Sequence, residues 1–434
     1  MSSEVGWARL PLKDAGVGLI DCDHRTPPAA AEGFPYVAIP QLRDGHIVLD
    51  GVRRITEADY VEWTKKLAPQ ANDVVVVRRC NSGESAHVPP GLKCAIGQNL
   101  VVLRADGSKV LPEYLRWLVR GTEWWDEVGK YINVGAVFDS LRCRDIPNFE
   151  LPIPPRTEQR EIARVLAALD DRITLLRETN TTLEAIAHAL FKSWFVDFDP
   201  VRAKMAGHAP EGMDEATAAL FPDALEETEL GLLPSGWRSG CLGDVAKTFK
   251  RAVTPSDLHA GVNYVGLEHI PRKSLTLTEW GDAAELESNK AIFNEGDILF
   301  GKLRPYFHKV VVAPTSGVCS TDILVCQPTQ AEHRGLATMY LFSDALISYA
   351  DRLSNGAKMP RVNWSDLAKF PIAVPSLEIS SAYTNAIEPL VSRMSHNTHV
   401  ARTLATIRDT LLPRLISGQL RLPEAQAQLE PHLS

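Results

Sequence analysis

A seam of apolar residues spaced three or four apart restricts the fold of this chain more than any other feature. It runs through residues 156–195 and recurs 221 positions later in the same phase. This spacing is typical of helices that pair in a coiled coil. At 1.5 Å per residue, each helix would be about 57 Å long, more than a globular core needs. The predicted seam residues are Ile162, Leu166, Leu169, Ile173, Leu176, Asn180, Leu183, Leu190, Ile387, Leu390, Met394, Asn397, Leu404 and Leu411.

The two seams are expected to pack against each other within the chain. Each is interrupted by an asparagine, Asn180 in the first and Asn397 in the second. A polar residue in a seam costs stability but can fix the register of the two helices. The alternative is a pair of ordinary amphipathic helices buried in separate domains, but their equal phase and length favour mutual pairing. Because a large domain flanks each helix, the pairing is predicted to be antiparallel.

The sequence that precedes each helix is also repeated. Gly6-Trp7 recurs as Gly236-Trp237, and the strand-like run at 73–77 recurs at 297–300. The offset between the copies changes only from 230 to 221 along the chain. Matching features in the same order indicate an internal duplication of a globular domain followed by a long helix.

The predicted fold class is α+β, with two tandem domains of mixed α and β structure, each followed by a long α-helix. The two helices pair as an antiparallel coiled coil about an internal pseudo-two-fold. Short valine- and isoleucine-rich runs predict strands, and helices are expected at 112–128, 215–220 and 337–353. The predicted ranges are 1–153 for the first domain, 154–198 for its helix, 199–234 for a connector, 235–375 for the second domain, 376–422 for its helix and 423–434 for a tail.

Composition places the chain among soluble globular proteins. Its 434 residues suit two or three domains, and no apolar run approaches the length of a membrane span. None of the seven cysteines forms a CxxC pair, so the sequence contains neither a zinc signature nor an even disulfide framework. These features lead us to expect a cytoplasmic protein with reduced cysteines.

The net charge of −8 argues at first against a nucleic-acid partner. However, residues 154–234 hold 15 acidic and 8 basic groups, which accounts for seven of the eight excess negative charges. Both globular regions are nearly neutral, so basic patches remain compatible with their composition.

Catalytic motifs are absent from the sequence. We find no GxxxxGK[ST] loop, GxGxxG fingerprint, GxSxG elbow or HExxH pair. Asp21, Asp23 and His24 could form a metal cluster, but carboxylates in such a polar stretch are more often turn formers. The sequence therefore predicts no catalytic residue and no metal site.

Basic and amide side chains instead gather at corresponding loops of the two copies. Arginine can recognise guanine, asparagine can recognise adenine, and lysine can neutralise phosphate. A solvated basic loop is the alternative for any single cluster, but different side chains in matching loops favour two readers of different sequences. The predicted DNA-contact residues are His24, Arg25, Thr26, Arg78, Arg79, Asn81, Lys250, Arg251, Lys302, Arg304, Tyr306, Lys358, Arg361 and Asn363, and Asn133, Arg142 and Arg144 lie in a further loop of the first copy.

Several of these segments resemble the specificity (S) subunits of type I restriction-modification systems. The resemblance includes the Gly-Trp-x4-Leu-x-Asp openings, Glu158-Gln159 at the start of the first helix, and the segments 191–201 and 301–306. It extends over almost the whole chain. One departure is that residues 376–379 differ from the Thr157-Glu158-Gln159 sequence at the start of the first helix.

This resemblance implies two target-recognition domains, each recognising one half of a bipartite asymmetric site on double-stranded DNA. It also implies that the helices set the spacing between half-sites and dock two modification (methyltransferase) subunits, with restriction (translocase and nuclease) subunits joining them. S-adenosylmethionine, ATP and Mg would then be bound only by those partners, and this chain would bind no cofactor and would not be an enzyme. A free-standing DNA-binding protein or repressor, and a scaffold without base readout, remain as alternatives.

Overall fold

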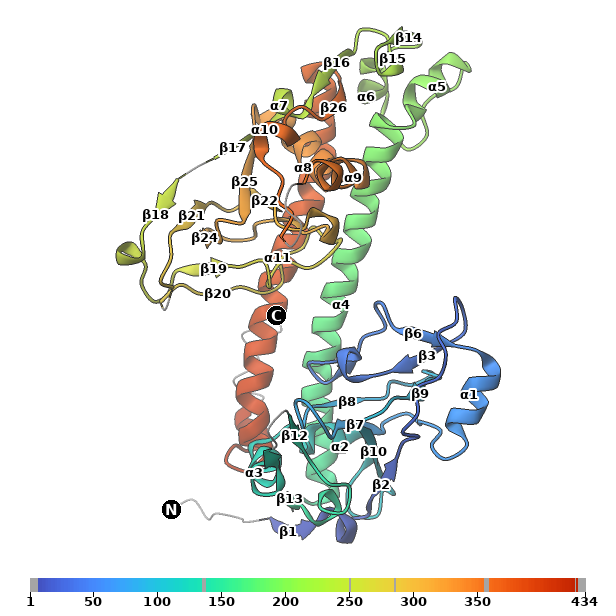
Figure 1. Ribbon diagram of the computed structural model, residues 1–434, viewed down its shortest axis with the longest axis vertical. Helices are drawn as coiled ribbons and strands as arrows, with labels where there is room; N and C mark the ends of the chain where they lie inside the picture. The colour runs from blue at the N-terminus through green and yellow to red at the C-terminus, as the bar shows by residue number, and fades with distance from the viewer. Residues whose placement is uncertain are drawn as a thin grey trace. The chain divides into compact units, whose positions relative to one another are not determined.

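The computed structural model describes residues 7–134, 138–249, 251–284, 286–354, 359–425 and 427. Two long helices, α4 (Arg156–Phe195) and α11 (Leu377–Ile416), pass through it (Figure 1). Within the described residues, no helix is both long and apolar enough to cross a membrane. Contacts divide the chain into one unit formed by residues up to 171 together with those from 404, and a second formed by residues 172–403. Each unit is described below by itself.

In the part of the first unit that the structure describes, the globular region consists of short strands and the three α-helices α1, α2 and α3. Its central sheet has the antiparallel order β2-β10-β7-β8, and a smaller sheet has the order β6-β3-β9. The elements are β1 (Ala8–Pro11), β2 (Val17–Asp21), β3 (Phe34–Val37), β4 (Leu42–Arg43), β5 (His46–Ile47), β6 (Arg53–Ile55), α1 (Glu57–Thr64), β7 (Val74–Val77), β8 (Ser85–His87), β9 (Ala95–Ile96), β10 (Leu100–Ala105), α2 (Pro112–Leu118), α3 (Thr122–Tyr131), β11 (Asn133–Val134), β12 (Asp139–Ser140) and β13 (Glu150–Ile153).

The second unit repeats this plan. Its central sheet has the order β17-β25-β22-β23, which matches β2-β10-β7-β8 in the first unit. The elements are α5 (Asp199–Met205), α6 (Glu215–Leu220), β14 (Leu225–Thr228), β15 (Gly231–Pro234), β16 (Arg238–Cys241), α7 (Leu242–Val245), β17 (Ala246–Thr248), β18 (Ala252–Val253), β19 (Asn263–Val265), β20 (Gly281–Asp282), β21 (Lys290–Phe293), β22 (Ile298–Gly301), β23 (Val310–Val312), β24 (Gly317–Cys319), β25 (Ile323–Pro328), α8 (Arg334–Phe342), α9 (Asp344–Leu353), α10 (Trp364–Leu367) and β26 (Pro371–Val374).

Short 3-10 turns connect several of these elements. They lie at Leu12–Ala15, Ile39–Gln41, Ile146–Asn148, Pro255–Asp257, Pro305–Phe307 and Ala331–His333.

Within the second unit, α4 and α11 pair antiparallel, as predicted. The side chain of Asn397 donates a 2.8 Å hydrogen bond to Asn180 Oδ1, and Asn180 donates one of 3.0 Å to the carbonyl of Met394. The Tyr383 hydroxyl donates to the carbonyl of Ala187 at 3.3 Å. Partner numbers on α11 fall as those on α4 rise, which defines the antiparallel direction. Of the predicted seam residues in the chain, Leu183, Leu190 and Leu390 are partly exposed and the others are buried.

An aromatic cluster holds the C-terminal end of α4 within the same unit. Phe191 lies 5.0 Å from Tyr340 in an edge-to-face contact, and Phe195 lies 4.8 Å from Tyr383. Trp194 contacts Tyr383 at 5.5 Å. Such pairs stabilise a core beyond the area that they bury. The aromatic residues at the end of the first seam thus attach α4 to α11 and to the second globular region.

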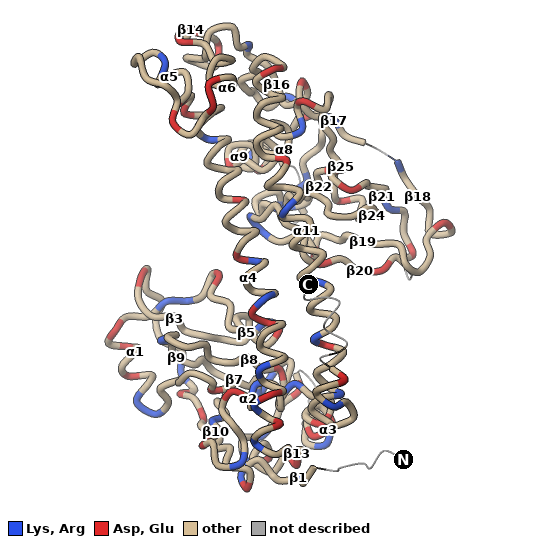
Figure 2. Tube along the Cα trace, turned by 180° about the vertical axis from the view of Figure 1, so that it is seen from behind, with Lys and Arg blue, Asp and Glu red and all other residues tan. Residues whose placement is uncertain are grey.

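In the first unit, the corresponding attachment is a buried ionic network. Arg408 of α11 donates to Asp170 of α4 at 2.6 Å, and its second terminal nitrogen lies 3.2 Å from Asp44. His46 lies 3.0 Å and Arg116 3.4 Å from the other Asp170 oxygen. Burial alone would raise the pKa of Asp170, but His46, Arg116 and Arg408 together lower it below the ordinary value. Figure 2 shows acidic and basic segments close together where α2 lies beside α4.

Two predictions about helices are wrong in part. The helix predicted at 112–128 is two helices that meet at Gly121, where an added Cβ would lie 2.8 Å from Ile416 Cγ2. The helix predicted at 337–353 is likewise two, because the Ser343 hydroxyl accepts from the N–H of Leu346 and caps α9. The helix at Glu215–Leu220 is confirmed. Helix α11 ends at Ile416 rather than at 422, shortly before Gly418, which has a positive φ of 78°.

Replacing Asp170 by asparagine should lower the free energy of unfolding of the first unit by about 3 kcal/mol, because buried Arg408 loses its most buried carboxylate partner and keeps only the more exposed Asp44 and Asp409. The contribution of Asp170 should persist above the pKa of an unfolded aspartate and disappear as pH falls through the lower folded pKa. Urea unfolding with hydrogen exchange at residues 404–416 measures both effects. Arg164→Gln, which breaks an exposed pair with Glu161 on the same helix, is the matched control and should change little.

Candidate nucleic-acid interface

The strongest candidate site in the first unit begins where β7 ends. The strand is a run of four buried valines, so the polar loop that follows emerges from the end of the central sheet. Arg78 accepts a 2.8 Å hydrogen bond at its carbonyl from the N–H of Leu141, and Arg79 forms an antiparallel bridge with Ser140. These contacts place the loop after β7 beside the segment that leads to β13.

A basic cavity lies between these two segments. It has a volume of about 510 Å³ and is lined by Arg78, Arg79, Ser140, Leu141, Arg142, Cys143 and Arg144. The guanidinium of Arg79 lies over the ring of Phe138 at 5.7 Å, and Arg144 lies 3.7 Å from Asp145. Buried Arg78 Nε has no hydrogen-bond partner among the described residues. Four arginines around one open cavity form a site that suits phosphate oxygens and the acceptor edge of a base.

Asn81, at the tip of this loop, has an unusual backbone conformation. Cys80 and Asn81 have φ values of 58° and 70°, which residues other than glycine rarely adopt. The Asp139 carboxylate accepts the N–H of Asn81 at 3.3 Å and that of Ser82 at 2.8 Å. The hydrogen bond from Ser82 is the main reason that the pKa of Asp139 is lowered. The carboxylate therefore holds the exposed Asn81 in a defined position.

The second predicted cluster in this unit has acidic neighbours. Arg25 lies 2.6 Å from Asp23 and 3.7 Å from Glu62, and its guanidinium is 4.7 Å from the ring of Trp63. Exposed pairs of this kind are weak and screened by salt, so DNA phosphate can compete for the arginine. Thr26 accepts a hydrogen bond from the Gln98 amide at 2.8 Å.

His24 lies in a small group of potential metal ligands. One ligand atom each from Asp21, Cys22 and His24 lies within 4.8 Å of the others. Burial raises the pKa of the Cys22 thiol to about 11, so it is protonated near neutral pH. Asp23, the third residue of the metal cluster weighed from the sequence, instead accepts the backbone N–H and guanidinium of Arg25. This is the turn-forming role expected of such a carboxylate.

The second unit contains the equivalent loop after β22. Lys302 accepts a 3.1 Å hydrogen bond at its carbonyl from the N–H of Val362, and Leu303 forms an antiparallel bridge with Arg361. These are the same two backbone contacts that the first unit makes, and the predicted residues Lys302 and Arg361 are therefore brought together. The N–H of Arg304, a residue with a φ of 51°, donates a 2.8 Å hydrogen bond to the carbonyl of Pro360.

The remaining predicted residues of the second unit are less closely grouped. Tyr306 and Asn363 are exposed, and Asn363 begins α10 without a side-chain cap. Arg251 is exposed and directly precedes β18, a strand of the five-stranded sheet, so it does not lie in the loop after β22. Lys250 and Lys358 lie outside the described residues. In the first unit, Asn133 lies in β11, opposite Ser140 of β12.

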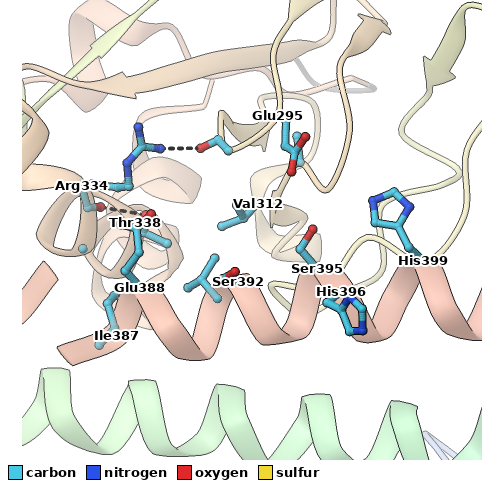
Figure 3. Close-up of a pocket in the computed structure, with 14 residues that line it drawn as sticks. Glu295, Val312, Arg334, Thr338, Ile387, Glu388, Ser392, Ser395, His396 and His399 are labelled. Carbon is cyan, nitrogen blue, oxygen red and sulfur yellow. Dashed lines mark hydrogen bonds between the residues drawn. The ribbon is translucent and has the colours of Figure 1, made fainter. Parts of the chain in front are cut away.

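A larger cleft of about 550 Å³ lies between the second globular region and α11. Figure 3 shows Ser392 and Ser395 projecting from α11 toward Val312, with His396 and His399 farther along the helix. Arg334, which also lines the cleft, donates a 3.1 Å hydrogen bond to the carbonyl of Gly296. None of the predicted DNA-contact residues lines this cleft, so it is separate from the candidate interface.

Sequence reasoning did not identify the carboxylates that support these loops. Asp139 lies three residues before Arg142 and Asp322 directly precedes β25, and only the fold shows which N–H or guanidinium groups they accept. It also missed Arg408, although a signal was present: this residue follows Leu404 by four positions and precedes Leu411 by three, in seam spacing.

Comparisons with known proteins agree with this architecture. The family model described as type I restriction modification DNA specificity domain matches residues 23–185 and 234–398. The MjaIX specificity subunit of a type I restriction enzyme from Methanocaldococcus jannaschii is 26% identical over 384 residues, covering 86% of this chain and 83% of the relative. The HindI specificity subunit from Haemophilus influenzae is 26% identical over 400 residues, covering 75% of this chain and 81% of the relative.

A solved structure is similar in fold. The crystal structure of the S subunit of a type I restriction-modification system from M. genitalium matches with a TM-score of 0.55 and 14% identity, covering 96% of this chain and 97% of the other. At that identity the match concerns the fold alone. Because the family model matches both halves of the duplication and most of the sequence, the chain belongs to the type I restriction modification DNA specificity domain family and contains that domain twice.

Proposed function

We propose that this chain is the DNA-recognition subunit of a type I restriction-modification complex, with each globular region recognising one half of a bipartite site. The observation that carries the proposal is the repeated loop. In both units the same two backbone contacts hold a basic loop beside the segment before the last strand of the domain, while the side chains differ. Shared backbone with different side chains is what two readers of unlike half-sites require.

The partners follow from the same proposal. Modification subunits dock on the helical region and supply S-adenosylmethionine chemistry, and restriction subunits supply ATP- and Mg-dependent translocation and cleavage. This chain contributes no catalytic group and binds no cofactor. Its net charge of −8 is compatible with DNA binding because basic partner subunits can neutralise phosphates that this chain does not reach.

Spacing is the other property assigned to the helices. In this proposal α4, α11 and the connector at 199–234 determine the unread bases between half-sites, and the recognition loops do not.

Exchanging residues 235–375 for those of a relative with a different target should change only one half of the methylated motif. Each region recognises its own half-site, so the other half should stay as it is in the parent. Methylation mapping of a host genome that carries either version provides the measurement. A change in both halves, or in neither, would contradict independent recognition.

Arg78→Ala should weaken binding to the first half-site by about 1–3 kcal/mol if this arginine contacts a base, and should relax specificity at one position. Arg304→Ala should have the same effect on the second half-site. Competition binding with duplexes altered at single positions shows which half-site each variant affects. Arg238→Ala, which removes the pair with Asp244 outside the loops and the long helices, is the control. An unaltered motif with unaltered affinity in the test variants would reduce them to solvated loop charges.

A further inference from the structure

The repeated loop is held in place by different side chains in the two units. In the second unit the Asp322 carboxylate accepts Arg361 Nε at 2.9 Å and Nη2 at 3.2 Å, a two-pronged contact. The carbonyl of the same Asp322 accepts the N–H of Lys302 at 3.0 Å. Arg361 is thus connected through one residue to the start of the basic loop, in addition to its backbone bridge with Leu303.

In the first unit a carboxylate acts without an arginine. Ser140 is the bridge residue that corresponds to Arg361, and its neighbour Asp139 binds the loop through backbone N–H groups. The carbonyl of Asp139 also accepts the N–H of Cys80 at 3.3 Å. Left-handed backbone at Cys80 and Asn81 costs free energy, and these hydrogen bonds offset that cost.

The guanidinium of Arg361 is therefore already paired with the Asp322 carboxylate. Its side chain is 43% exposed, so an exposed ion pair alone would not prevent it from contacting DNA. However, the planar two-pronged contact, the shared Asp322 and the backbone bridge all direct it toward the loop. A lysine could supply the same charge to a phosphate, but it could not reproduce the two-pronged geometry.

We propose that Asp139 in the first domain and the Asp322–Arg361 pair in the second are positioning residues that fix the shape of the DNA-reading loops, and that Arg361 acts through Asp322 and not on a phosphate. This inference rests on the proposed function. It assigns Arg361 a role in specificity, whereas Arg142 and Arg144, which are exposed around the basic cavity, contribute to phosphate binding.

The test compares Arg361→Lys with Arg361→Gln in the full-length chain assembled with the modification subunits of its host. The probes are a duplex carrying the motif that the wild-type complex methylates, and a duplex with only the second half-site scrambled. Both variants should lower the ratio of the two affinities about tenfold or more, while the slope of log affinity against log salt stays at the wild-type value. Arg238→Gln, which breaks the 2.9 Å pair with Asp244 away from the loop, is the matched control and should preserve both quantities.

A phosphate contact gives the opposite pattern. Arg361→Gln would then reduce the magnitude of the salt slope by about one and weaken both duplexes alike, and Arg361→Lys would remain near the wild type. That result would overturn the inference. As a rescue, the double variant Asp322→Arg with Arg361→Asp, which exchanges the two charges, should recover part of the lost affinity ratio. An unchanged affinity ratio in both Arg361→Lys and Arg361→Gln would also count against the positioning role.

Asp139 is tested at the first half-site. Asp139→Ala should lower the affinity ratio for a duplex with a scrambled first half-site, and Asp139→Asn, which keeps one acceptor oxygen, should lower it less. Unaltered ratios in both variants would contradict the role of Asp139. If the wild-type complex methylates no defined motif, the proposed function itself is wrong, whereas a defined motif with unaffected variants refutes the positioning role alone.

Discussion

Pairing of α4 with α11 is the constraint on which the rest of the molecule depends. An apolar seam that is exposed to water is unfavourable, so each helix buries its seam against the other helix and against the globular region beside it. The chemistry of this attachment differs between the two units. In one, the buried residues Arg408 and Asp170 are paired, and the partly buried His46 and Arg116 lie against Asp170. In the other, Phe191, Trp194 and Phe195 pack around Tyr383.

The two kinds of attachment respond differently to changes in pH and salt. An aromatic cluster tolerates changes in pH and salt, because its ring contacts do not depend on a charged group. A buried ion pair is costly to desolvate and strongly penalises any arrangement that leaves one charge alone. Burial and the neighbouring Arg116 also lower the pKa of His87 to about 4, so this histidine is neutral and accepts from Arg116 near physiological pH. His87 therefore adds no positive charge beside Arg116 near neutral pH.

The long helices, the duplicated order of strands and the short helix at Glu215–Leu220 could be predicted from the sequence because local periodicity determines them. The break at Gly121 had a local signal, because glycine disfavours a helix interior, but the close approach of Ile416 to this glycine, almost 300 residues away in the chain, could not be predicted. The position of basic loops could be predicted, but their supporting carboxylates could not. Asp139 and Ser82 are 57 residues apart, and no local pattern marks a contact at that separation.

The backbone contacts of the recognition loops have a consequence for how such a protein can acquire a new target. The N–H of Leu141 and the N–H of Val362 make the bonds that hold the loops after β7 and β22. Every amino acid except proline offers that N–H. As long as the supporting Asp139, Asp322 and Arg361 are kept, mutation can therefore replace the outward side chains during evolution while the loop keeps its course. Proline at either position is the one substitution that the hydrogen bond itself forbids.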